Sequence, residues 1–68
     1  MTMATSDLFH AATPADVSLH DQIACVEREI RLRERVYARW VEIGKLTQEA
    51  ADREILCMRA VLATLQTK

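Results

Sequence analysis

The chain has 68 residues, of which 50% are apolar and 28% charged, and its nine Lys and Arg against ten Asp and Glu give a formal net charge of -1. This balance excludes a disordered chain, and it disfavours a protein that is drawn as a whole to nucleic acid or to an anionic membrane. A chain this short seldom gains more than about 3 to 5 kcal/mol from a single core, so we expect it to need a partner chain.

The amino-terminal part shows no sustained hydrophobic periodicity, so we predict a flexible arm over residues 1–17 and a helical domain over residues 18–68. Thr13-Pro14-Ala15-Asp16 has the pattern of a capping box with proline at the first helical position, and Ser18-Leu19-His20-Asp21 has a second such pattern. We expect the later box to begin the first helix and the earlier one to form a turn before it.

A first helix is predicted from Leu19 to Ile43, because apolar residues recur there in steps of four and three. This spacing places them on one side of a helix, as in a coiled coil. Arg33 occupies one position where the pattern calls for an apolar residue. The apolar positions of this stripe are Leu19, Ile23, Val26, Ile30, Tyr37 and Trp40.

The stretch between Trp40 and Ala51 predicts a turn between two helices. Gly44 is the only glycine in the chain, and it suits the left-handed conformation that ends many helices. Thr47 suits the N-cap of a second helix, which we predict from Gln48 to Gln66. Because a short connection forces two helices to be antiparallel, the predicted fold class is all-α, an antiparallel two-helix hairpin that resembles a coiled coil. The apolar positions of the second helix are Ala51, Ile55, Met58, Leu62 and Leu65.

Several apolar residues fall outside both stripes, and two helices alone cannot cover all of them. A second copy of the hairpin would cover them, so we predict a homodimer with a four-helix arrangement. Leu32, Val36, Leu56 and Val61 are the candidates for this second apolar face. The full set outside the stripes is Cys25, Leu32, Val36, Val41, Leu56 and Val61.

The sequence offers little for catalysis or metal binding. His10, His20, Cys25 and Cys57 do not form a pair with the spacing that brings two ligands onto one helical face. A two-helix chain also lacks a cleft that would bury a pair of carboxylates, so we predict no metal, no cofactor and no enzyme activity. With neither a signal peptide nor an apolar run of transmembrane length, we expect a cytoplasmic protein with no membrane contact and two free thiols.

Four arginines recur along one outer side of the first helix at steps of three, four and four. Arginines that stand four apart repel, which destabilises a helix unless carboxylates intervene or a partner binds. One interpretation is a solvated face, neutralised by the flanking glutamates. The other is a binding surface for a protein, since Arg, Tyr and Trp are enriched at binding hot spots. The candidate binding residues are Arg28, Arg31, Arg35, Tyr37, Arg39 and Trp40, and the neutralising glutamates are Glu27, Glu34 and Glu42.

Three glutamates each stand four residues before an arginine, the order that favours an ion pair on a helix. These expected pairs are Glu27 with Arg31, Glu29 with Arg33 and Glu49 with Arg53. Each is worth about 0.2 to 0.5 kcal/mol, so they act on helix stability rather than on chemistry.

A resemblance extends over four segments, which are Ser6 to Phe9, Thr13 to Val26, Arg35 to Trp40 and Ala51 to Ile55. Across them the chain resembles small proteins encoded by temperate phages and prophages of proteobacteria. In size and hairpin pattern it is also similar to the phage anti-activator proteins that suppress host quorum sensing, which are two-helix dimers. This resemblance implies a protein that inhibits a host protein in the host cytoplasm by occupying its surface. The implied targets are a LuxR-type transcription activator and a type IV pilus assembly ATPase.

Two hypotheses from different classes follow. The first is a host-directed protein inhibitor, and the alternative is a structural or accessory phage protein that only associates with itself or with another phage component. A nucleic-acid binder would direct the arginines at phosphates, but the interleaved glutamates leave the first helix near neutral and disfavour it.

Overall fold

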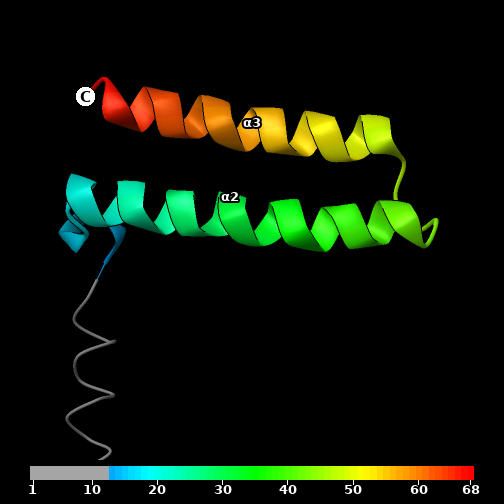
Figure 1. Ribbon diagram of the computed structural model, residues 1–68. Helices are drawn as coiled ribbons and strands as arrows, with labels where there is room; N and C mark the ends of the chain where they lie inside the picture. Colours follow the sequence, from blue (N-terminus) through cyan, green and yellow to red (C-terminus); the bar gives the residue numbers. More distant parts are fainter. Residues whose placement is uncertain (1–12) are drawn as a thin grey trace, which may run out of the picture.

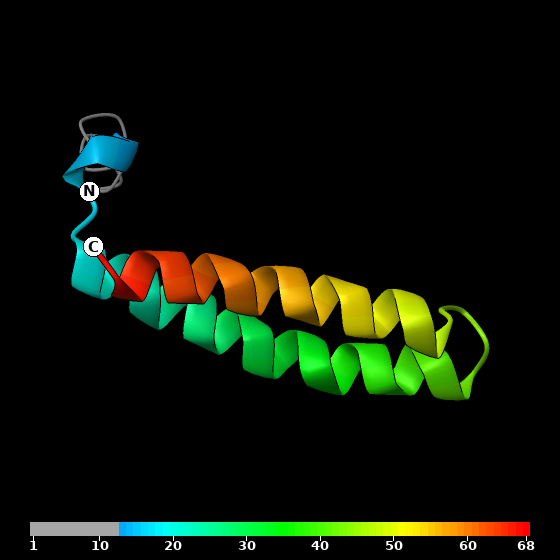
Figure 2. The same ribbon diagram turned by 90° about the horizontal axis from the view of Figure 1, so that it is seen from above.

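The computed structural model describes residues 13–68, which form two antiparallel helices that lie side by side (Figures 1 and 2). A short 3-10 turn, η1 (Pro14–Asp16), precedes the helices α2 (Leu19–Glu42) and α3 (Gln48–Gln66). The predicted all-α hairpin is confirmed, and both helices begin at the predicted residues. For residues 1–12 the predicted flexible arm lies outside the described part of the chain.

Side-chain caps order the chain before α2. The carboxylate of Asp16 accepts a hydrogen bond of 2.9 Å from the Thr13 backbone N–H, which closes the first capping box around η1. The Ser18 Oγ accepts one of 3.0 Å from the Asp21 backbone N–H. Since each cap satisfies a backbone group that has no partner within its helix, α2 begins at the later box, as predicted.

The connection between the helices is closed by main-chain hydrogen bonds around Gly44, whose φ of 80° lies in the left-handed region. The Lys45 N–H donates to the Trp40 carbonyl at 2.8 Å, and the Gly44 N–H donates to the Val41 carbonyl at 3.1 Å. These two bonds form a Schellman motif, which satisfies the last carbonyls of α2. The Thr47 Oγ1 then caps α3 by accepting a bond of 3.1 Å from the backbone N–H three residues later.

The contact between the helices is a single narrow layer. Within residues 13–68 the buried hydrophobic residues are Ile30 and Ala51, each only 4% exposed. Most other members of the two predicted stripes are half-buried against the opposite helix. Trp40 differs from them because 41% of it is exposed. It lies two residues before the end of α2, next to the connection to α3.

Candidate protein-binding site

The arginine row, defined here as Arg28, Arg31, Arg35 and Arg39, lies along the outer side of α2. All four residues are exposed, whereas Ile30, on the side of α2 that contacts α3, is buried. Steps of three and four residues keep the row on one side of the helix, because an α-helix turns by about 100° per residue. The predicted arrangement of four exposed arginines on α2 is therefore present.

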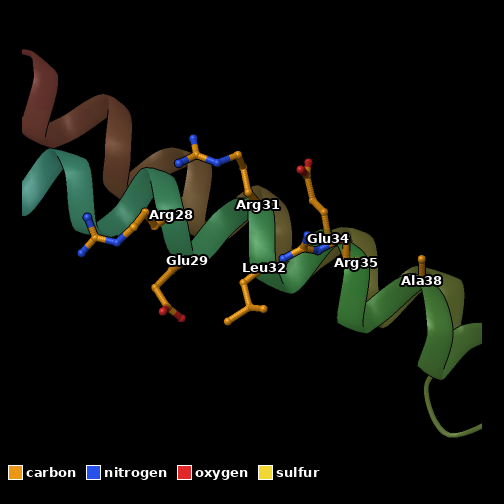
Figure 3. A pocket seen from close by; sticks show the side chains of 7 residues that line it. All are labelled: Arg28, Glu29, Arg31, Leu32, Glu34, Arg35 and Ala38. Atoms are coloured by element: carbon orange, nitrogen blue, oxygen red, sulfur yellow. The ribbon is translucent and has the colours of Figure 1, made fainter.

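Part of the row lines a hollow of about 770 Å³ on α2 (Figure 3). Figure 3 shows Arg31 and Glu34 projecting to one side of the helix and Leu32 projecting to the other. Leu32 is 45% exposed, so an exposed apolar side chain borders the arginine row on this other side. The residues that line this hollow are Arg28, Glu29, Arg31, Leu32, Glu34, Arg35 and Ala38.

A second hollow, of about 430 Å³, lies where α2 meets the turn. It shares Arg35 with the first hollow and adds the side chains of Arg39, Trp40 and Lys45. The two hollows thus form one strip along α2 that combines cations with exposed apolar groups. The lining residues of this second hollow are Arg35, Val36, Arg39, Trp40, Ile43 and Lys45.

The ion pairs of residues 13–68 do not involve the arginine row. Glu29 pairs with Arg33 at 3.4 Å, as predicted, and Glu34 pairs with Arg59 of α3. Glu34 was expected to neutralise the row, but its ion pair is with Arg59 instead. The predicted pairs of Glu27 with Arg31 and of Glu49 with Arg53 are not among the ion pairs of the described residues.

Tyr37 lies apart from the arginine row, on the side of α2 that contacts α3. Its hydroxyl accepts a hydrogen bond of 3.1 Å from an Nη of Arg33, and its ring centroid is 5.8 Å from that of Trp40. The contact with Tyr37 first, and the charge of Glu29 next, raise the pKa of Arg33 from its already high usual value. Arg33 therefore carries its charge at every physiological pH, even though its Nε is covered by the chain.

Five of the six predicted binding residues therefore line the strip. The sixth, Tyr37, lies outside it, and its ring contacts that of Trp40. Sequence reasoning missed that Leu32, Ile43 and Lys45 belong to the same surface. The signal was available, because Leu32 stands four residues after Arg28 and Ile43 stands four after Arg39.

The described residues do not offer a metal site. No group of three or more His, Cys, Asp or Glu residues within 13–68 could hold a metal ion, and His10 lies outside this part. Cys25 and Cys57 are free and exposed. Neither α2 nor α3 is long and apolar enough to cross a membrane.

Comparisons of the chain with protein-family models, with curated proteins and with solved structures found no match.

Proposed function

We propose that the protein acts by binding, and that the strip on α2 recognises an acidic surface of another protein. The observation that carries this proposal is that no arginine of the row forms an ion pair within residues 13–68. Arg31 and Arg35, and likewise Arg35 and Arg39, are like charges four residues apart, which costs a helix about 0.2 to 0.5 kcal/mol per pair. Carboxylates of a partner would relieve this repulsion and would form charge-assisted hydrogen bonds with the guanidinium groups.

The apolar members of the strip favour a protein over a nucleic acid. Leu32, Trp40 and Ile43 are 45%, 41% and 55% exposed, and each lines one of the two hollows. Nucleic-acid bases can stack on Trp40 but offer little to the aliphatic Leu32 and Ile43, whereas protein interfaces combine apolar anchors with a polar rim. Arg and Trp are also among the residues that dominate binding energy at protein interfaces.

We further propose that the hairpin works as a homodimer with a four-helix arrangement and inhibits a host protein by occupying its surface. The resemblance to phage anti-activator proteins makes a LuxR-type transcription activator and a type IV pilus assembly ATPase the first two targets to test. The second candidate function is self-association alone, as a structural or accessory phage protein. Exposed apolar residues outside the arginine strip favour self-association, because a second copy of the chain would cover them without any host protein.

The test is calorimetric titration of the protein with a short polyglutamate peptide, and then with each of the two purified host proteins. Replacing both Arg35 and Arg39 by Glu should weaken each complex by about tenfold or more, because two charge-assisted contacts become repulsive. The matched control replaces Arg53 and Lys68 by Glu, which changes the net charge equally at positions outside the strip. Helicity is compared by circular dichroism in every case.

Equal binding by the parent and the Arg35/Arg39 variant would place the site elsewhere. Equal weakening by the Arg53/Lys68 control would mean that only net charge matters. Tighter binding of a single-stranded oligonucleotide than of a peptide with the same charge would favour the nucleic-acid function. If the protein binds neither the peptide nor the host proteins, the result would support self-association alone as its function.

A further inference from the structure

The two broad sides of the hairpin differ in charge, and the ion pair between Glu34 and Arg59 identifies them. Because this pair bridges the helices, both residues lie on the same side, which we call the polar face. Val36 is two residues from Glu34, and Cys57 and Val61 are each two residues from Arg59. A step of two residues turns an α-helix by about 200°, so these three lie on the opposite side.

This opposite side, the apolar face, is defined by Val36 of α2 and by Ala50, Cys57 and Val61 of α3. Val61 is 51% exposed and Cys57 is exposed, while Val36 and Ala50 are half-buried. The charges on this side are Glu54 and the pair of Glu29 with Arg33, which is already neutralised. The polar face carries more charges, namely Glu27, Arg31, Glu34, Asp52 and Arg59.

We propose that the apolar face is the interface with a second copy of this chain. The proposal rests on the homodimer proposed above and assigns its contact surface. Apposition through the outer side of α2 would bring two arginine rows together, and apposition through the polar face would bury several charged side chains. Like charges opposite each other and charges left unpaired on burial both oppose association. The apolar face has a single charge outside the ion pairs of the described residues, Glu54, so the charge distribution favours this face over the other two.

The area of this face is sufficient for a specific interface. α3 has 19 residues and α2 is longer, so the helices run side by side for about 28 Å at a rise of about 1.5 Å per residue. Two helices of about 10 Å diameter then present a face of about 560 Å² per copy. The total of about 1,100 Å² exceeds the roughly 1,000 Å² expected of a specific interface, whereas one helix alone would supply only half of it.

The four residues predicted to form one second apolar face, Leu32, Val36, Leu56 and Val61, do not all lie on the same side of the hairpin. Val61 lies on the apolar face away from the arginine strip, whereas Leu56 lines a hollow on the polar face. Val36 lies on the apolar face and also lines the second hollow of the strip, and Leu32, four residues before it, projects to the side opposite Glu34 (Figure 3). The dimer would therefore cover Val61 and reach the edge of the strip at Val36, while the exposed guanidinium groups on the outer side of α2 stay outside the contact. Cys57 and Val61 belong to α3 and line neither hollow of the strip, so they test the dimer contact independently of the arginine row.

The native thiol of Cys57 reports whether the apolar face is covered. In a Cys25→Ser chain, we expect its reaction with Ellman's reagent to slow by about sevenfold as the protein is concentrated from about 1 to about 100 times a Kd of about 1 µM, because the fraction of monomer falls by that factor. The matched control carries Ala38→Cys in a chain whose native cysteines are both replaced by Ser; Ala38 is exposed and lines a hollow of the polar face together with Glu34 and Arg59. Its rate should not depend on protein concentration. Sedimentation should show the mass of two chains over the range in which Cys57 is protected.

A single-chain mass at the highest concentration would overturn the proposal, as would equal slowing at both thiols or slowing at the Ala38→Cys position alone. As a second variant, Val61→Glu should raise the dissociation constant by at least about tenfold by placing an unpaired charge in the interface. If that variant does not fold, the thiol kinetics of the Cys25→Ser chain still decide the outcome. A dimer that forms but does not bind the polyglutamate peptide would refute the function of the arginine row and leave this inference standing.

Discussion

Replacing Gly44 by Ala tests whether the left-handed connection specifies the hairpin. Gly44 has a φ of +80°, and a Cβ added there would meet no atom within 4 Å. The substitution therefore introduces backbone strain without a steric clash. The left-handed conformation costs an L residue about 1 to 2 kcal/mol in the folded state. Ala also lowers the conformational entropy of the unfolded chain, which offsets part of this cost, so we expect the free energy of unfolding to fall by about 1 kcal/mol.

For a domain of this size such a loss lowers the melting temperature by about 4 to 8 °C. The measurement is thermal unfolding followed by circular dichroism, with all variants at one protein concentration, because dimerisation couples stability to concentration. Gly44→Asn is the matched control, since Asn tolerates the left-handed conformation better than Ala and should be less destabilised. An Ala variant as stable as the parent, or an Asn variant less stable than the Ala variant, would refute the reasoning.

Two further predictions concern the layer between the helices. Ile30→Ala removes a side chain that is 4% exposed and should lower the free energy of unfolding by about 2 to 5 kcal/mol, which approaches the whole stability of so small a core. We therefore expect little helical signal in circular dichroism at 25 °C. The control Val26→Ala changes a half-buried residue and should remain folded. Arg33→Leu restores the apolar pattern and should raise the melting temperature, while sedimentation should reveal assemblies of mixed size, because polar residues in such seams specify register and oligomeric state. A lower melting temperature of the Leu variant would show that the hydrogen bond from Arg33 to Tyr37 contributes more than apolar packing.

The sequence was sufficient to predict the backbone of the hairpin, because its signals are local. Ser18, Gly44 and Thr47 each act within one helical turn, and periodicity over many residues marks the side of each helix that packs. Such signals do not depend on the rest of the fold. The helix bounds agree accordingly, and only the end of α2 moves, from the predicted Ile43 to Glu42.

The surface was harder to predict because it depends on contacts between the helices. Glu34 stands near Arg31 and Arg35 in sequence, yet it pairs with Arg59, which is 25 residues away. The spacing along the first helix does not show that Arg59 competes with the arginine row for Glu34. The sequence therefore predicted a row with more neighbouring negative charge than it has. Trp40 has the spacing of a core residue, yet it is 41% exposed, next to the end of α2.

The position of the connection also bears on how the hairpin forms. Tyr37 and Ala51 line one groove next to the turn, and bringing them together closes a loop of about 14 residues. The contact of Glu34 with Arg59 closes one of 25 residues, which adds an entropic penalty of about 0.5 kcal/mol. The contacts nearest to Gly44 should therefore form first, and pairing should spread from the turn toward the ends of the two helices. On this pathway, a substitution beside the turn would mainly slow folding, and one far from it would mainly accelerate unfolding.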